Sequence, residues 1–298
     1  MVRTPVRRSP WLSAATGADV FLKLETLQPT FSYKIRGAFN AILRLAETTS
    51  DAPPLVTASA GNHGRALALA AGTLGMRLTV YVPATAPRTK VDAILACGAE
   101  LVACTDYDEA ELAAKEHGAS GRALYISPYS HPDVIAGAGT VGLEILEDRP
   151  DVDTIVAPVG GGGLLSGIAI TARALSRALV TGVEVEASSP FTQGLAAGRI
   201  VKIDVAPTLA DSLAGNLDPD TVTFDIVRAL VSNIVRVTES ELQIAVSGLA
   251  TEERLIVEGG GACGVAAAIA GKLQVAGRCV AIVVSGANID MEKFKTLI

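Results

Sequence analysis

A strand pattern gives way to a helix pattern around the stretch Thr30-Phe31-Ser32-Tyr33-Lys34-Ile35-Arg36-Gly37-Ala38, which carries a single lysine. Residues 20–25 alternate as a β-strand does, and apolar residues recur at helical spacing from Lys34 onward. Lys34 is therefore predicted to begin a helix, where a cation is slightly unfavourable because it opposes the helix dipole. Lys34 is either a solvated surface lysine or a functional one, and the rest of the chain favours function.

The composition is that of a globular protein. The 298 residues are 49% hydrophobic and 19% charged with a net charge of −6, which suits one large or two medium domains. This charge leaves no basic surface, so no nucleic-acid partner is expected. The basic start is followed by no apolar segment, so no signal peptide is expected. Four cysteines without disulfide or zinc spacing favour a reducing, cytoplasmic setting: Cys97, Cys104, Cys263 and Cys279.

Strand-like and helix-like runs alternate along almost the whole chain. The strand-like runs are residues 55–58, 77–82, 100–103, 124–126, 153–159, 180–186, 234–237 and 279–284. The helix-like runs are residues 63–74, 89–96, 109–116, 164–175, 241–255 and 262–273. This alternation predicts an α/β fold with parallel-rich sheets flanked by helices.

A run of four glycines, Gly160-Gly161-Gly162-Gly163, follows one predicted strand and opens a helix. Successive glycines let backbone N–H groups close on an anion at a helix N-terminus, which favours a small phosphate group over a simple tight turn. No GK[ST] follows, so a nucleoside triphosphate is not expected. The uncharged residues 154–172 around this run are long enough to span a membrane. Pro158 and the glycines instead favour a buried strand, loop and helix, so no membrane partner is expected.

A second glycine motif, Gly137-Ala138-Gly139-Thr140-Val141-Gly142, matches the dinucleotide-binding pattern G-x-G-x-x-G. The preceding apolar run is too short for a strand, and no acidic residue follows at the expected spacing. We interpret the motif as close helix packing, with a nicotinamide-dependent oxidoreductase as the alternative.

Two further polar motifs follow predicted strands. Ser59-Ala60-Gly61-Asn62-His63 opens a helix, where it either caps the helix or presents N–H groups to a carboxylate. Ser285-Gly286-Ala287-Asn288 follows the strand near the C-terminus. The histidines form neither a metal cluster nor a catalytic triad. Ligands in parallel sheets bind at the carboxyl ends of strands, so a lysine, a phosphate site and these groups indicate a phosphorylated aldehyde cofactor.

These motifs, in this order, resemble those of the threonine/serine dehydratase and serine racemase family, pyridoxal-phosphate enzymes of the tryptophan-synthase-β fold (fold type II). The resemblance implies that Lys34 forms the Schiff base with pyridoxal 5'-phosphate, and that Asn62 bonds the ring hydroxyl of the cofactor. It also implies that Gly160, Gly161, Gly162 and Gly163 hold the phosphate and that Ser285 meets the pyridine nitrogen. Ser59, Ala60, Gly61, Asn62 and His63 would bind the substrate carboxylate.

The resemblance further implies a homodimer and two domains: a large cofactor domain from residues 1–52 and 131–298, and a small substrate-side domain from residues 53–130. No residues remain for a C-terminal regulatory domain, so none is expected. The sequence departs from the family at Tyr33, Ser212 and the glycines after Glu258. Pro190 and Thr192 follow Glu186 where metal-binding members carry acids, so no metal is expected.

The expected reaction is elimination of water from a small amino-acid substrate with a β-hydroxyl, of the L-threonine or L-serine type, giving a 2-oxo acid and ammonia. Lys34 would take the Cα proton, and the neutral Ser285 would make the ring a weak electron sink, which favours prompt elimination. In serine racemases of the family a serine stands at the position of Ala60 and serves as the acid or base on the face opposite Lys34. Ala60 has no proton to give, so elimination is expected to dominate. A racemase and a hydroxyaspartate dehydratase are the alternatives within the family. A non-catalytic amino-acid-binding module is a further alternative.

Overall fold

The computed structural model of the chain describes residues 1–49 and 52–298; Ser50 and Asp51, which fall at the end of the expected segment 1–52, lie outside the described residues. The chain divides into two compact units. The smaller comprises Lys34–Gly137 with Met1, and the larger comprises Val2–Tyr33 and Ala138–Ile298. The expected domain of residues 53–130 falls within the smaller unit, and its assignment as a separate domain stays a prediction.

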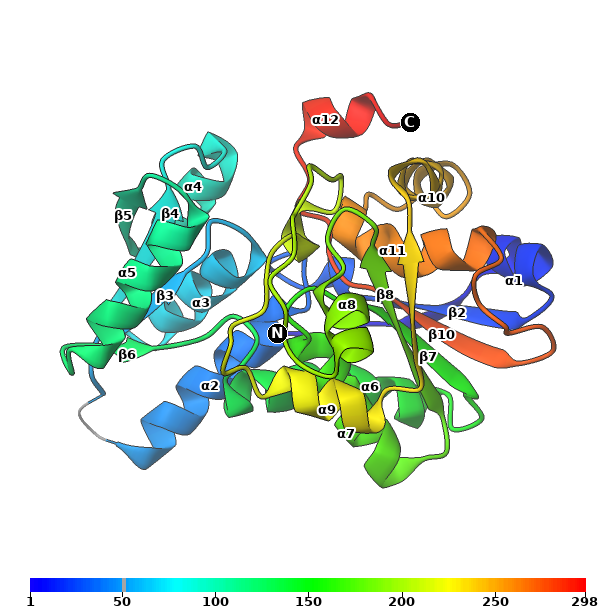
Figure 1. The fold of residues 1–298 in the computed structure, drawn as a ribbon, viewed down its shortest axis with the longest axis horizontal. Coiled ribbons are helices and arrows are strands. Elements are labelled where there is room, and N and C mark those ends of the chain that lie inside the picture. The colour runs from blue at the N-terminus through cyan, green and yellow to red at the C-terminus, as the bar shows by residue number, and fades with distance from the viewer. Residues whose placement is uncertain (50–51) are drawn as a thin grey trace. The chain divides into compact units, whose positions relative to one another are not determined.

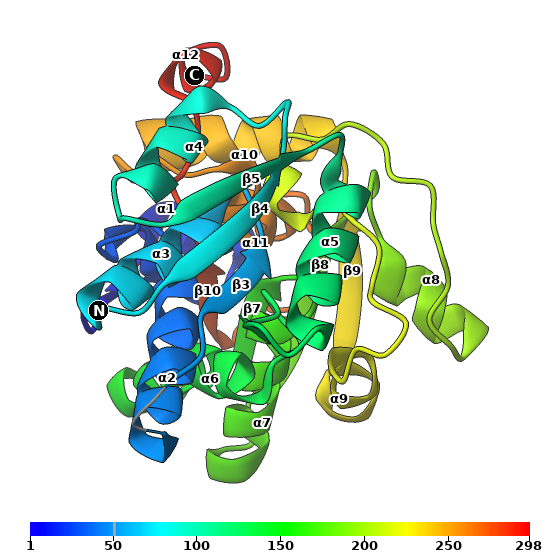
Figure 2. The same ribbon diagram turned by 90° about the vertical axis from the view of Figure 1, so that its left-hand side faces the viewer.

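The smaller unit contains a four-stranded parallel sheet in the order β5-β4-β3-β6. Its strands are β3 (Leu55–Ala58), β4 (Leu78–Pro83), β5 (Glu100–Cys104) and β6 (Leu124–Tyr125), and its helices are α2 (Lys34–Thr48), α3 (Asn62–Thr73), α4 (Arg88–Leu95) and α5 (Tyr107–Ala119). Leu55 packs with α2, α3 and α4, whereas its neighbour Val56 packs with α5. Helices therefore cover both faces, and Figure 2 shows β3, β4 and β5 between α5 and the pair α3 and α4.

The larger unit contains a six-stranded sheet in the order β1-β2-β10-β7-β8-β9, in which only β1 and β2 pair antiparallel. The strands are β1 (Val6–Arg8), β2 (Asp19–Leu24), β7 (Thr154–Pro158), β8 (Leu179–Val185), β9 (Asn233–Val237) and β10 (Cys279–Val284). The α-helices are α1 (Pro10–Thr16), α6 (Pro132–Asp148), which begins in the smaller unit, α7 (Gly163–Leu175), α8 (Pro190–Ala197), α9 (Thr223–Leu230), α10 (Glu239–Thr251), α11 (Gly259–Ile269) and α12 (Met291–Lys295); the 3-10 turns are η1 (Glu25–Leu27) and η2 (Asp211–Leu213). The predicted α/β class with parallel-rich sheets is confirmed.

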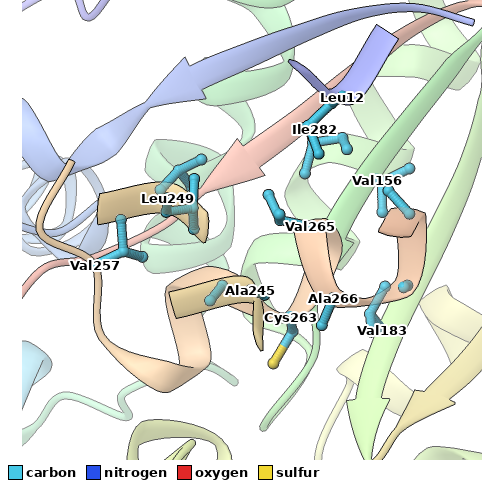
Figure 3. Close-up of a cluster of buried hydrophobic side chains, with 14 of the residues drawn as sticks. Leu12, Val156, Val183, Ala245, Leu249, Val257, Cys263, Val265, Ala266 and Ile282 are labelled. Atoms are coloured by element: carbon cyan, nitrogen blue, oxygen red, sulfur yellow. The ribbon is translucent and has the colours of Figure 1, made fainter. Parts of the chain in front are cut away.

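The core of the larger unit lies on both faces of its sheet, because successive side chains of a strand point to opposite faces. In β10, Val280 and Ile282 pack with α10 and α11, whereas Ala281 and Val283 pack with α6 and α7. Figure 1 shows these two pairs of helices on opposite sides of the strands, and Figure 3 shows Val265 of α11 beside Ile282. Each fully buried aliphatic side chain stabilises the fold by roughly 1.5–3 kcal/mol.

This arrangement positions the polar motifs. β10 pairs in parallel with β2 on one side and β7 on the other, so the C-terminal ends of these strands lie at the same edge of the sheet. The uncharged residues 154–172 form β7, the glycine loop and α7, as predicted. Within residues 1–49 and 52–298, no helix combines the length and apolar character needed to cross a bilayer.

The G-x-G-x-x-G motif lies inside α6 and not at a strand-to-helix turn. A Cβ added to Gly137 would lie 2.7 Å from the Cα of Gly37 in α2, and one added to Gly142 would lie 3.3 Å from the Cα of Ile168 in α7. The glycines let α6 approach its neighbouring helices closely. The helix-packing interpretation is confirmed, and the nicotinamide alternative loses the motif on which it rested.

We expect Gly137→Ala to lower the stability of the protein by about 1–3 kcal/mol relative to Gly142→Ala, because its methyl group meets unyielding backbone. Both variants gain the same helix propensity from alanine, so their difference isolates the contact. Urea unfolding midpoints measure the effect. Equal midpoints for the two variants would contradict the close-packing account of Gly137.

Candidate functional site

The segment before Lys34 is held against the turn that follows β10. The backbone N–H of Tyr33 donates to the carbonyl of Ser285 at 3.0 Å, and that of Ala287 donates to the carbonyl of Phe31 at 2.8 Å. The side-chain amide of Asn288 donates to the carbonyl of Thr30 at 2.8 Å. Two motifs from opposite ends of the chain therefore form one hydrogen-bonded structure in the larger unit. The peptide bond after Tyr33 leads directly to Lys34.

The buried carboxylate of Glu258 is hydrogen-bonded to this turn. Glu258 is 3% exposed, and its carboxylate accepts hydrogen bonds from the N–H of Asn288 and the hydroxyl of Ser212, each at 3.0 Å. Its own N–H donates to the carbonyl of Gly286. Burial, followed by the charge of Glu258, raises the pKa of the Tyr33 phenol above its usual range. The phenol therefore stays protonated, and it can serve as a hydrogen-bond donor.

The glycine run forms an uncapped helix N-terminus. Gly162 is the N-cap of α7 with a φ of 86°, and it provides no side-chain bond to the first N–H groups of the helix. A Cβ on Gly162 would lie 2.5 Å from the ring of Phe191 and 3.0 Å from Thr223. The hydroxyl of Thr223 donates to the carbonyl of Gly161 at 2.8 Å, which fixes the loop. The first N–H groups of α7 therefore have no side-chain cap, and a helix N-terminus of this kind can bind an anion.

Lys34 is the first residue of α2, as predicted, and its Nζ donates to the carbonyl of Pro128 at 2.7 Å within the smaller unit. His63 belongs to the same unit and is 2% exposed. Burial, followed by the positive charge of Lys34, lowers the pKa of His63 to about 3. A backbone hydrogen bond with Ile126 raises the pKa of His63 and only partly offsets these two causes. Lys34 and the predicted carboxylate-binding motif therefore share one electrostatic environment.

The predicted carboxylate-binding motif forms a turn that opens α3. The hydroxyl of Ser59 accepts a hydrogen bond from the N–H of Gly61 at 3.2 Å. Gly61 is the N-cap of α3 and gives its first N–H groups no side-chain bond, so Asn62 begins the helix and does not cap it. The alternative that this motif caps α3 is wrong, because the Ser59 hydroxyl accepts from Gly61 within the turn and no side chain bonds the first N–H groups of the helix. The first N–H groups of α3 lack a side-chain cap, as those of α7 do.

Comparison with known proteins agrees with these features. The family model described as "Pyridoxal-phosphate dependent enzyme" matches residues 1–286. The chain is 41% identical to an L-threonine ammonia-lyase of Thermotoga maritima over 99% of this chain and 74% of the relative. It is 40% identical to an L-threo-3-hydroxyaspartate ammonia-lyase of a Pseudomonas species, over 99% and 93% of the two chains. The solved structure of maize serine racemase superposes with a TM-score of 0.92 at 32% identity, over 99% and 91%.

The chain belongs to this family of pyridoxal-phosphate dependent enzymes. The predicted family resemblance and the predicted cofactor are confirmed. The residues present fit a phosphorylated ring at the edge of the larger sheet. The uncapped glycine loop offers donors to a phosphate, and the buried hydroxyl of Ser166, in the first turn of α7, has no hydrogen-bond partner among the described residues. The role of each predicted site residue stays a prediction.

Glu258 is a member of the candidate site that was not predicted from the sequence. It is the only charged residue between Arg254 and Lys272, in an otherwise apolar and glycine-rich run. That isolation was the available signal, because a carboxylate there must be buried with donors. Pro190 and Thr192 stand where metal-binding members of the family carry acids. Thr192 lies in the first turn of α8 and donates from its N–H and hydroxyl to the buried carboxylate of Glu184. The expectation that no metal binds here stays a prediction.

We expect Gly161→Asp to weaken the binding of pyridoxal phosphate by at least about tenfold, because it adds a side chain and a negative charge to an anion site. Absorbance titration of the apoprotein measures the affinity. Ser176→Asp is the matched control, since it adds the same charge about 20 Å away at the other end of α7. Equal affinities in the two variants would remove the phosphate assignment.

His63 should make the apoprotein sensitive to acid. Its pKa is about 3 in the folded chain and 6.5 ordinarily, so below pH 6.5 only the unfolded chain takes up a proton there. Stability attributable to His63 is complete above that pH and falls by about 1.4 kcal/mol per pH unit as pH decreases toward the folded-state value.

His63→Gln should remove this loss, so its urea unfolding midpoint should fall less than that of the wild type between pH 7 and pH 5. Parallel pH profiles for the two proteins would show that His63 titrates alike in the folded and unfolded chains.

Proposed function

We propose that the chain catalyses the elimination of water from a small β-hydroxy amino acid of the L-threonine or L-serine type, giving a 2-oxo acid and ammonia. The observation that carries the proposal is the hydrogen bond from the Tyr33 N–H to the Ser285 carbonyl. This bond holds Tyr33, the residue before Lys34, at the C-terminal end of β10, where Ser285 provides a neutral side chain. Relatives named L-threonine ammonia-lyase support the reaction type.

The cofactor contacts are part of the proposal. Lys34 would carry pyridoxal phosphate, and the N–H groups of the glycine run, residues 160–163, would bind its phosphate. Ser285 would accept or donate one hydrogen bond at the ring nitrogen, and Asn62 would bond the ring hydroxyl. The uncapped loop before α7 and the fixed turn after β10 support these assignments, because both lie at the C-terminal edge of parallel strands.

When bound, pyridoxal phosphate supplies an aldehyde for the substrate amine and an electron-withdrawing ring that acidifies the substrate Cα–H bond. The Nζ of Lys34 would take the Cα proton as a general base. The uncapped N–H groups at the start of α3 would orient the substrate carboxylate through Ser59, Ala60, Gly61, Asn62 and His63. His63 is neutral at physiological pH. It therefore adds no positive charge that would oppose protonation of the Lys34 amine when this amine takes the Cα proton.

Two features favour elimination over racemisation. Ser285 is neutral, so it cannot stabilise a positively charged ring nitrogen as an aspartate would, and the ring is a weak electron sink. Negative charge that develops at Cα is therefore relieved by loss of the β-hydroxyl. Racemisation also needs a proton donor on the face opposite Lys34. Ala60 stands where the racemase resemblance expects a serine, and it has no proton to give.

The proposal includes a cytoplasmic homodimer in which residues 53–130 form the substrate-side domain. The absence of a disulfide among Cys97, Cys104, Cys263 and Cys279 is compatible with a reducing compartment. The family resemblance supports the dimer.

The direct test incubates the holoprotein with L-serine and L-threonine and measures oxo acid, ammonia and D-enantiomer. We expect oxo acid and ammonia in equal amounts and little D-enantiomer, because one face of the substrate lacks a proton donor. D-product forming as fast as oxo acid would favour the racemase alternative. Cofactor absorbance without any turnover would favour a binding module.

Lys34→Ala in the same assay should reduce turnover by at least about a thousandfold, since it removes the base and the cofactor linkage. Lys115→Ala is the control, because it removes a lysine of the same unit that pairs with Glu111 one turn away on α5. Circular dichroism should show the same fold in both variants.

A further inference from the structure

Ser212 lies on the exposed side of the larger unit's candidate site, in the turn η2. Its neighbour Leu213 reaches the glycine loop, where a Cβ on Gly160 would lie 3.1 Å from the Cα of Leu213. On the other side, Ser212 is bonded to Glu258, which supports the Ser285 turn. Ser212 therefore lies between the proposed phosphate site and the proposed ring-nitrogen partner, with its side chain open to solvent.

The hydrogen-bond roles at Ser212 follow from the chemistry of its partner. A carboxylate can only accept, so the Ser212 hydroxyl donates its proton to Glu258 Oε1 at 3.0 Å. Glu258 is in turn fixed by the N–H of Asn288, so its orientation is not free to change. Ser212 therefore has only lone pairs left for a ligand. It accepts from a hydroxyl or an ammonium, but it gives nothing to a carboxylate.

The charges around this turn act in the same direction. Residues 208–213 contain Asp211 and no lysine or arginine. The hydroxyl of Thr208 and the N–H of Leu209 donate to the carboxylate of Glu239, so a second acid lies against the same loop. The carboxylates of Glu258 and Glu239 therefore both lie against the loop that carries Ser212, and an acidic side chain brought to this loop would be repelled.

We infer that Ser212 determines specificity: it selects amino acids with a neutral, hydroxyl-bearing side chain and disfavours those with a β-carboxylate, such as 3-hydroxyaspartate. This inference deepens the proposed function and rests on it for the position of the substrate. The Ser212 lone pairs accept from a substrate β-hydroxyl. Against a β-carboxylate, two acceptors face each other and neither is satisfied.

Gly260 is required for this arrangement. A Cβ on Gly260 would overlap the Ser212 hydroxyl oxygen and would lie 3.2 Å from Cγ of Leu213. Any larger residue at position 260 therefore turns the hydroxyl away from Glu258 and frees its proton for a ligand. Two independent substitutions then end the acceptor-only state of position 212: Ser212→Ala removes the hydroxyl, and Gly260→Ala frees its proton for a ligand.

The test measures the binding of two amino acids that cannot lose water, 2-methyl-L-serine and L-aspartate, to the holoprotein through changes in cofactor absorbance. 2-Methyl-L-serine keeps the β-hydroxyl but has no Cα proton, so it binds without reacting. We expect the wild type to bind the neutral ligand at least about tenfold more tightly, the size of effect that one unsatisfied acceptor produces. Ser212→Ala and Gly260→Ala should each lower this ratio several-fold. Ser176→Ala, which removes a hydroxyl at the far end of α7, should leave it unchanged.

Equal wild-type affinities, tighter binding of aspartate, failure of the neutral ligand to bind, or an unchanged ratio in Ser212→Ala would each overturn the inference. The proposed function is tested separately by turnover of L-threonine and L-threo-3-hydroxyaspartate. If neither is converted, the proposed function fails while the binding ratio still tests Ser212. If hydroxyaspartate is converted faster and aspartate also binds more tightly, only the specificity assignment fails.

Discussion

The hydrogen bond from the Tyr33 N–H to the Ser285 carbonyl is the constraint on which the site depends. It joins segments about 250 residues apart in sequence, so neither end of the chain can form the site alone. The bond belongs to an antiparallel bridge between Ser32 and Gly286. This bridge follows the parallel contact of β2 with β10, in which Leu24 lies opposite Val284. The sheet therefore determines where the chain leaves the larger unit after Tyr33 and enters the smaller unit at Lys34. The residues between β2 and β10 must bring β10 back beside β2.

Much of this fold could be predicted because its strands are continuous apolar runs with polar or glycine ends. Residues 279–284 form β10 as predicted, and the glycine run opens α7 within one residue of the predicted start. β1 was missed, since its three residues include Arg7 and Arg8 and pair at the edge of the sheet. Its strand state comes from pairing with β2 and not from its own composition.

The candidate site could be predicted only where its residues follow strands in sequence. Lys34 lies at the start of a helix, and the serine and glycine motifs lie at strand ends, as their patterns indicated. The role of Glu258 could not be predicted, because its partners Ser212 and Asn288 are 46 and 30 residues away. Nor does local sequence show that His63 is buried, because its burial arises from the packing of the whole smaller unit.

The backbone alone cannot determine which amino acid such a site accepts. The maize serine racemase superposes with a TM-score of 0.92, while relatives with 40% and 41% identity are named as lyases for different β-hydroxy amino acids. Proteins that share an architecture so closely must differ in reaction and substrate through individual side chains. In this chain the backbone donors at α3 and α7 suit any amino-acid carboxylate and any phosphate. Discrimination therefore falls to side chains such as Ser212, whose one proton is committed to Glu258.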